Sequence, residues 1–312
     1  NGHFMHQFTY FIGEVNFYYK DSNGKKHVAV MNTGDSMYIT PFTPHTFTTR
    51  KGSKKNGLIL ALTYGNNIAG DPQQELSALG TDIGSQFVLN FSELKFAYSS
   101  LLTYHMNNYS VDVDGLSQKS KISVDKIQKI IDGNAIPSNL ELQSIAKSLQ
   151  VNIRDLLPSD IIPEKVIVNY HNDSDSRYFP SDSKKYSIYD LASSLALPYS
   201  KALEFSILSE KHEVFDLQVG LHQYGYNVGD TPITLNWQYN SNTFIKILEP
   251  GDSFYVKPFI PHSFTGNGKL LVLRLGGNVA GDSQRELSFI GKENVTRAIS
   301  ENTQWFDPSG KN

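Results

Sequence analysis

An internal repeat constrains this chain more than any other feature. The segment PFTPHTFT at 41–48 returns as PFIPHSFT at 258–265, 217 residues later, and the Gly-Asp pair that precedes it returns at the same offset. Both copies continue into related tails, GNNIAGDPQQELSALG at 65–80 and GGNVAGDSQRELSFIG at 276–291. Such self-similarity means that one type of domain occurs twice. The two copies can therefore be compared for the residues that each has kept.

The length and composition of the chain exclude several kinds of partner and binding site. A length of 312 residues fits two domains of about 100–150 residues, each with its own core. The net charge of −3 gives no electrostatic case for nucleic acid or an anionic membrane as the main partner. The lack of cysteine excludes disulfides and thiolate metal sites, and no apolar run approaches the roughly 20 residues of a membrane span. We expect a cytoplasmic protein, and the composition is compatible with a homo-oligomer.

Residues 1–92 have the pattern of a β domain. Asn23-Gly24 is a strong signal for a hairpin turn, and further glycines separate the other aromatic and β-branched segments. Short strands at regular spacing favour a barrel or a sandwich over alternating strands and helices. The strands predicted in this domain are 8–12, 15–19, 27–30 and 58–62.

Residues 93–158 change to a helical period. Ser138 and Glu141 form the pattern of a capping box that opens a helix. The stretch resembles the repressor type of helix-turn-helix, so it is either a DNA-binding module or a bundle kept for packing. The expected recognition helix offers Lys126 and Lys129 but also Asp125, and the chain is acidic overall. These charges favour the packing role.

The strand pattern resumes near residue 203 and continues to residue 275, which places the second β domain within 159–312. In this copy the helical part precedes the β part. If the first copy has the same plan, its N-terminal part precedes Asn1. We therefore expect that 1–92 is an incomplete first domain, followed by the helical module and the second domain.

Three residues of the first copy form a candidate metal site. On a straight strand, residues four apart such as His3 and Gln7 stand about 13 Å apart, so a tight turn must separate them if they share one metal. His45 follows a rigid proline-containing stretch and is expected on the opposite rim. Two histidines and one oxygen ligand leave three positions open, as in non-haem Fe(II) enzymes. The alternative is that Gln7 is an ordinary polar strand residue and that another ligand completes the site.

The other histidines are weaker candidates. In the second copy, His222 and His262 have no oxygen partner between them at ligand spacing, so we interpret that domain as structural and metal-free. His6 is adjacent to Gln7 and should point to the opposite face of the strand. Four further histidines are expected at the surface: His27, His105, His171 and His212.

The repeat resembles the cupin superfamily. Its second motif is matched by Gly34, Asp35, Pro41 and His45, and its first by Asn1, His3, Gln7 and Gly13. There are two departures, because many cupins have a histidine where this chain has Asn1 and a glutamate where it has Gln7. The resemblance implies a mainly β fold with an α-helical insert. Two cupin barrels (double-stranded β-helix, or jelly-roll) would be separated by the helix-turn-helix-type module.

Within the cupins, the ligand spacing and the helical module resemble the non-haem iron enzymes of phosphonate biosynthesis. Hydroxypropylphosphonate epoxidase shares the spacing but has one cupin per chain and a glutamate ligand. Hydroxyethylphosphonate dioxygenase has the doubled plan but takes its carboxylate six residues before the last histidine, where this chain has Ile39. The branch that releases methylphosphonate has both the doubled plan and a glutamine ligand. The chain is most similar to that branch, over its whole length.

The resemblance implies an oxidoreductase that holds Fe(II) through His3, Gln7 and His45. Its reaction would cleave the C–C bond of 2-hydroxyethylphosphonate with O2 to give methylphosphonate and CO2. Asn1 would contact the phosphonate, Ile39 would lie near the metal, and Arg, Lys or Tyr donors are expected before Asn1. Two alternatives stay open. One is the dioxygenase reaction, which gives hydroxymethylphosphonate and formate, and the other is a ligand-sensing transcriptional regulator.

Overall fold

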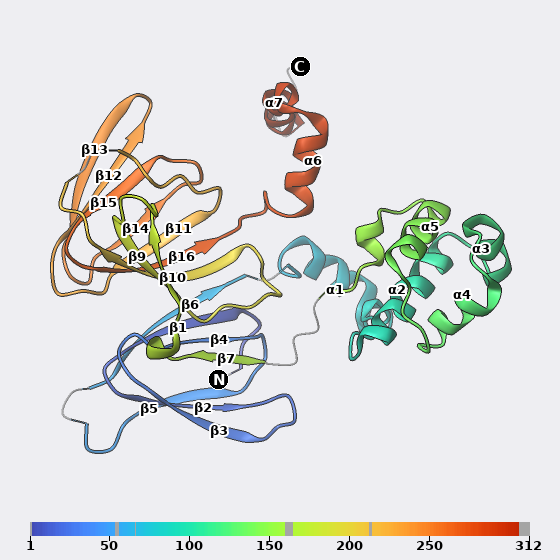
Figure 1. Cartoon of the computed structure of the whole chain (residues 1–312), viewed down its shortest axis with the longest axis horizontal. Coiled ribbons are helices and arrows are strands. Elements are labelled where there is room, and N and C mark those ends of the chain that lie inside the picture. Colours follow the sequence, from blue (N-terminus) through green and yellow to red (C-terminus); the bar gives the residue numbers. More distant parts are fainter. Residues whose placement is uncertain (1, 54–55, 66, 160–164, 212–213, 306–312) are drawn as a thin grey trace.

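The computed structural model of the chain describes residues 2–53, 56–65, 67–159, 165–211 and 214–305. Within these residues the fold is mainly β, as predicted, and contains seven α-helices. The strands form two β lobes that lie against each other, and a group of helices stands to one side of them (Figure 1).

The N-terminal β lobe consists of two sheets, with strand orders β6-β1-β4-β7 and β3-β2-β5. The predicted hairpin at Asn23-Gly24 joins β2 to β3, with Gly24 at a φ of 77°. The strands of this lobe are β1 (His6–Ile12), β2 (Val15–Lys20), β3 (Lys26–Met31), β4 (Ser36–Ile39), β5 (His45–Thr49), β6 (Leu58–Tyr64) and β7 (Val166–Asn169). Strand β7 follows the helical region in sequence but pairs with β4, so the chain returns to its first lobe before it builds the second.

The C-terminal β lobe repeats this plan with one larger sheet, ordered β14-β11-β16-β10-β9-β8, and a three-stranded sheet, ordered β13-β12-β15. Its hairpin at Asn240-Ser241 has positive φ at both residues, 49° and 63°, as a tight type I′ turn requires. The strands are β8 (Ser176–Phe179), β9 (Tyr186–Asp190), β10 (Ser200–Ile207), β11 (His222–Asn227), β12 (Ile233–Tyr239), β13 (Asn242–Leu248), β14 (Ser253–Val256), β15 (His262–Gly266) and β16 (Lys269–Leu275).

Strand β1 is buried on both of its faces, which determines where a site can lie. Alternate residues of a strand point to opposite sides. Phe11 packs in the interior of the N-terminal lobe with Phe17 and Ile39. Phe8 and Tyr10, on the other face, pack against residues of β10 and β16. The outer face of the first lobe is therefore covered by the second lobe, and only the interior face of β1 is available for a ligand.

A buried carboxylate links the two lobes. Glu204 of β10 is 0% exposed; Tyr10 donates a hydrogen bond to it at 2.5 Å, and Lys269 donates another at 3.0 Å. The Nε2 atom of His171 lies 3.0 Å from the same carboxylate, so the prediction that His171 is a surface residue is wrong. Burial would raise the pKa of Glu204, but these hydrogen bonds and the charge of Lys269 hold it below its ordinary value.

We expect Glu204→Gln to lower the free energy of unfolding by about 1.5–3 kcal/mol, the usual value of hydrogen bonds to a charged group. A carboxylate with a lowered pKa stabilises the fold above its unfolded pKa and loses that contribution as pH falls through the folded pKa. The difference between variant and wild type should therefore shrink below about pH 4. Urea unfolding at pH 7 and at acid pH measures it, with the exposed Glu249→Gln as control. Equal stability of Glu204→Gln and wild type at pH 7 would contradict this role.

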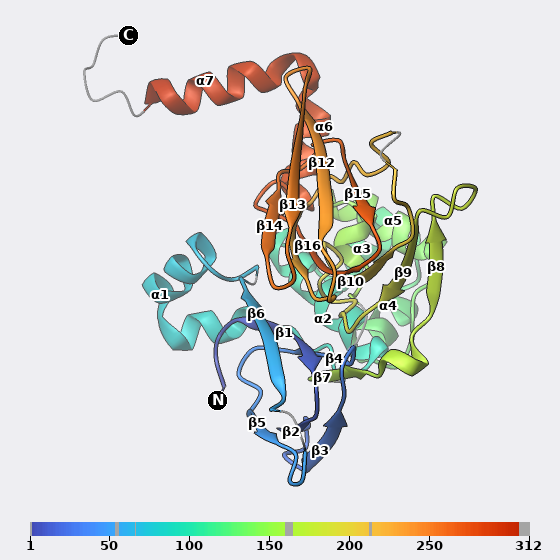
Figure 2. The same ribbon diagram turned by 90° about the vertical axis from the view of Figure 1, so that its left-hand side faces the viewer.

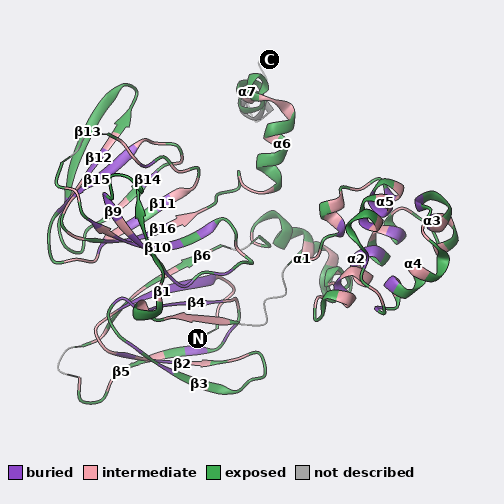
Figure 3. Ribbon diagram, in the orientation of Figure 1, coloured by how far each residue is buried: buried purple, intermediate pink, exposed green. Residues whose placement is uncertain are grey.

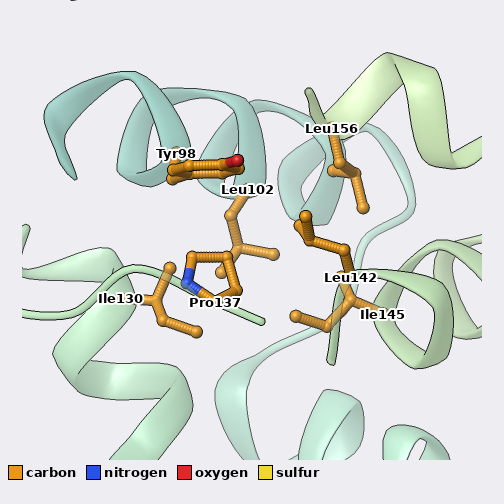
Figure 4. A pocket seen from close by; sticks show the side chains of 7 residues that line it. All are labelled: Tyr98, Leu102, Ile130, Pro137, Leu142, Ile145 and Leu156. Atoms are coloured by element: carbon orange, nitrogen blue, oxygen red, sulfur yellow. The ribbon is translucent and has the colours of Figure 1, made fainter. Parts of the chain in front are cut away.

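The helical module has a core of its own. It contains α2 (Leu94–Asn108), α3 (Val113–Ser120), α4 (Val124–Ile131), α5 (Asn139–Leu149) and the short η2 (Ile153–Leu156). The predicted capping box is confirmed, since Ser138 and Glu141 bond reciprocally at the start of α5. Apolar side chains from α2, α4, α5 and η2, among them Leu102, Ile130 and Leu142, converge around a small gap (Figure 4).

Both tails of the repeat form helices, which the strand pattern does not predict. Helix α1 (Asp71–Gly84) follows β6, and α6 (Asp282–Ile290) with α7 (Val295–Trp305) follows β16. Short 3-10 turns complete the secondary structure: η1 (Ser85–Phe87), η3 (His171–Asp173) and η4 (Lys292–Asn294). Helices α6 and α7 are largely exposed, and α7 extends away from the lobes (Figures 2 and 3). Among the described helices, none has the length and apolar character to cross a membrane.

Candidate metal centre

A bend in the chain brings His3 and Gln7 together, as the candidate metal site requires. Residues before His6 are not part of a strand, and Gln7 is the second residue of β1. The backbone N–H of Phe42 donates to the His3 carbonyl at 2.7 Å, which attaches this segment to the turn before β5. The Nε2 atom of His3 lies 2.7 Å from Oε1 of Gln7. The expected turn between the two residues is therefore present.

His45 completes the group from another strand. It is the first residue of β5, it is 5% exposed, and its ring centroid lies 5.4 Å from that of His3. Its Nδ1–H donates to the Thr43 carbonyl at 2.9 Å, which orients the ring. Burial, and to a lesser degree His3, lower the pKa of His45, so the imidazole is neutral at neutral pH. A neutral, oriented imidazole is the form that binds metals.

The ring nitrogens of His3 and the Gln7 amide form a donor set that would hold a cation. Its Nδ1 lies 2.8 Å from the Met5 carbonyl and its Nε2 lies 2.7 Å from the Gln7 oxygen, so both ring nitrogens face acceptors. A neutral imidazole has a single N–H and can serve only one of them. When Nδ1–H donates to Met5, the Nε2 lone pair faces the amide oxygen directly. His3 Nε2 and Gln7 Oε1 would both be satisfied by a metal ion that binds them together.

Thr9 determines which end of the Gln7 amide faces His3. The amide nitrogen of Gln7 donates to the Thr9 hydroxyl at 3.0 Å, so the oxygen turns toward the imidazole. Thr9 is two residues after Gln7 and lies on the same face of β1. Sequence reasoning did not select Thr9, although this two-residue spacing was the signal that could have found it.

The surroundings of this site are apolar. Ile39 of β4 pairs with Gln7 in the sheet, is fully buried, and packs in the core of the N-terminal lobe. Asn1, the predicted substrate contact, lies outside the described residues. Within the described residues, no group of three or more His, Asp or Glu side chains could hold a metal ion. A site here therefore depends on the amide oxygen of Gln7.

The other histidines lie away from this centre. His6 points to the opposite face of β1, as predicted, and its Nδ1 lies 2.6 Å from the hydroxyl of Tyr38. His27 and His105 are partly buried, with His27 paired to Asp21 at 2.8 Å. His212 lies outside the described residues.

The second copy retains more of the site than the sequence comparison indicates. Strand β11 pairs with β14 through Gln223 and Val256, in the register by which Gln7 pairs with Ile39. Gln223 is therefore the counterpart of Gln7, and it lies 3.0 Å from His262. The amide nitrogen of Gln223, and not its oxygen, faces His262, so the interpretation of this domain as metal-free stays a prediction. An ungapped comparison misaligns these two residues, because the distance in sequence from β1 to β4 is one residue shorter than that from β11 to β14.

Comparison with known proteins identifies the family. No family model matches the chain. The chain is 56% identical, over all 312 residues, to the methylphosphonate synthase of Nitrosopumilus maritimus (strain SCM1), and it spans 68% of that protein. The chain belongs to the methylphosphonate synthase family. This membership confirms the predicted class of enzyme, an oxidoreductase of the non-haem iron oxygenase type.

Solved structures agree with this assignment. A Streptomyces albus HEPD, solved with 2-hydroxyethylphosphonate and Fe(II) bound, superposes with a TM-score of 0.86 at 31% identity, covering 96% of this chain and 67% of its own. A variant of 2-hydroxyethylphosphonate dioxygenase superposes with a TM-score of 0.77 over 96% of this chain and 71% of its own. At 19% identity this second likeness shows the fold alone.

Proposed function

We propose that this member of the methylphosphonate synthase family cleaves the C–C bond of 2-hydroxyethylphosphonate with O2. The products are methylphosphonate, CO2 and water, which balances the atoms of the substrate and O2. Fe(II) is the cofactor, and His3, Gln7 and His45 are its ligands. The observation that carries this proposal is the approach of His3 Nε2 and Gln7 Oε1 to 2.7 Å, with both histidines oriented by backbone carbonyls.

The three proposed ligands are neutral, and this has a consequence for the substrate. An amide in place of a carboxylate leaves the site one charge more positive, which favours a dianionic phosphonate. Fe(II), when bound, supplies open positions at which substrate and O2 can meet. Ile39 is apolar and fully buried beside Gln7, so it adds no further carboxylate to the centre. The two imidazoles and the amide hold the metal, and their positions are set by β1 and the start of β5.

We also propose that the two β lobes are cupin barrels, with only the first holding metal, and that the helical module is of the helix-turn-helix type. The packing role of the module is supported by its charges. On α4, Lys129 pairs with Asp125 at 2.7 Å and Lys126 lies 3.7 Å from Glu141. Two lysines with carboxylate partners are poor phosphate contacts. A gel shift at physiological salt should show no retained DNA, and retention would favour the regulator alternative. A cytoplasmic location remains a prediction.

The product formed tests the proposed reaction. We expect the Fe(II)-loaded protein, mixed with 2-hydroxyethylphosphonate and O2, to yield methylphosphonate by phosphorus NMR, together with CO2. Hydroxymethylphosphonate with free formate would assign the dioxygenase reaction instead. No consumption of 2-hydroxyethylphosphonate would contradict the proposed substrate.

Thr9→Val should weaken Fe(II) binding by about 10- to 100-fold, the usual effect of removing a group that orients a metal ligand. The substitution keeps the shape of the side chain but removes the hydroxyl that accepts from the Gln7 amide. The amide is then free to turn its nitrogen toward His3. Anaerobic competition with a chromophoric chelator measures the affinity. Thr48→Val, at an exposed position of β5, is the control, and equal affinity of the two variants would exclude the role of Thr9.

A further inference from the structure

The C-terminal lobe keeps two of the three proposed ligand positions. His262 is the first residue of β15, as His45 is of β5. Its Nδ1 bonds to the Ile260 carbonyl at 2.8 Å, in the same way as His45 bonds to Thr43. Gln223 takes the place of Gln7, and both Gln223 and His262 are 1% exposed. The second lobe therefore has an imidazole and an amide at the strand positions that His45 and Gln7 occupy in the first.

The third position differs between the lobes. The backbone N–H of Phe42 donates to the carbonyl of His3 at 2.7 Å, and the N–H of Phe259 donates to the carbonyl of Val219 at the same distance. Phe42 and Phe259 are corresponding residues of the repeat, and both have φ near 60°. Val219 therefore occupies the backbone position of His3. The second lobe has lost one histidine ligand there.

A partly buried arginine enters the second lobe where the first has a threonine. Arg274 of β16 pairs with Gln223 of β11, in the register by which Thr63 of β6 pairs with Gln7. Paired residues of antiparallel strands point to the same face, so Arg274 shares the interior face of Gln223. Its guanidinium carbon lies 5.5 Å from the centre of the Phe205 ring, which belongs to the core of this lobe. Burial lowers the pKa of Arg274 to about 10, so its charge remains at neutral pH.

The two ends of the Gln223 amide have different partners, the guanidinium of Arg274 and the imidazole of His262. Arg274 Nε donates to Gln223 Oε1 at 2.9 Å, and Gln223 Nε2 lies 3.0 Å from His262 Nε2. With its Nδ1–H directed to Ile260, His262 accepts from the amide nitrogen. The Gln223 oxygen thus faces a permanent cation, as the Gln7 oxygen faces the proposed iron. One of the two terminal nitrogens of the Arg274 guanidinium, Nη2, is buried without a hydrogen-bond partner among the described residues.

We propose that the positively charged Arg274 guanidinium takes the place of a metal ion in the C-terminal lobe. This lobe would bind a divalent metal if Arg274 did not occupy the site and if a histidine stood in place of Val219. Restoring the residues of the first lobe, through Val219→His and Arg274→Thr, opens that site. The new imidazole, Gln223 and His262 then supply two nitrogens and one oxygen.

Cobalt(II) binding tests this proposal, because a bound Co(II) ion has visible absorption. The double substitution is made in a protein that also carries His45→Ala, so that the first lobe binds no metal. We expect about one Co(II) per chain in the triple variant, and none with His45→Ala alone or with either second-lobe substitution added singly. A triple variant that folds and binds no Co(II) overturns the proposal. Co(II) retained by His45→Ala alone would instead count against the iron ligands proposed for the first lobe.

A measurement on the unmodified protein covers the case in which the triple variant does not fold. Nitrogen-15 NMR of labelled histidines reports which ring nitrogen of His262 carries the proton, and His262→Ala assigns its signals. We expect a proton on Nδ1 and a bare Nε2 at neutral pH. A proton on Nε2 would require the Gln223 oxygen to face His262 and not Arg274, and this result would overturn the proposal.

Discussion

His45→Ala should remove Fe(II) from the protein and with it the turnover of 2-hydroxyethylphosphonate. The two ligands left, one imidazole and one amide, cannot hold a labile divalent ion. Since even the loss of a group that only orients a metal ligand lowers affinity by about 10- to 100-fold, the loss of a ligand should exceed about 100-fold. The same result is expected for His3→Ala. Iron analysis after anaerobic loading and desalting, together with the initial rate of O2 consumption, measures both effects.

The repeat supplies a matched control for this substitution. His262 begins β15 as His45 begins β5, and it is even less exposed, so His262→Ala removes an equally buried imidazole from the second lobe. We expect one Fe(II) per chain and unchanged turnover in this variant. Near-stoichiometric iron in His45→Ala, or half the iron lost in His262→Ala, would contradict a single centre in the first lobe.

Deuterium placed on C2 of 2-hydroxyethylphosphonate should appear in the methyl group of the product. Methylphosphonate requires that a one-carbon fragment remain beside the phosphonate-bearing carbon long enough to transfer its hydrogen and leave as CO2. Gln7 is neutral and Ile39 is apolar and buried, whereas the sequence resemblance implies a carboxylate at the position of Ile39 in the formate-releasing enzymes. Mass spectrometry should find one deuterium per methyl group. A methyl group without deuterium would show that its third hydrogen comes from another source, such as solvent.

The amount of free formate released during the reaction is a second measure of the same step. If the fragment stays in the site, formate should not accumulate and labelled carbon from C2 should be recovered as CO2. Deuterated formate in an amount equal to the phosphonate product would assign the chain to the dioxygenase reaction. Glutamine ligation would then not determine the outcome.

The sequence was sufficient to propose the ligand set because His45 lies in the repeated segment 41–48 and His3 and Gln7 precede it at ligand spacing. His3 and Gln7 required a turn between them, and the structure has a bend there. The face of β1 on which His6 lies followed from the two-residue period of a strand. Each of these inferences used residues close together in the chain, where backbone geometry alone decides the outcome.

Features that depend on residues distant in sequence were missed. Strand β7 pairs with β4 across more than 120 residues, and His171 reaches Glu204 only because the lobes pack against each other. The role of Arg274 follows from its register opposite Gln223, which no local pattern encodes. The helices of the repeat tails were missed because their apolar positions are sparse, and the structure leaves α1 and α6 without buried residues.

The most direct test of the central claim is the anomalous scattering of iron in crystals grown with Fe(II) in the absence of O2. We expect one peak per chain, within bonding distance of His3 Nε2, Gln7 Oε1 and an imidazole nitrogen of His45, and no peak beside Arg274 in the second lobe. A peak bound by a different set of side chains, or a second peak between Gln223 and His262, would contradict it.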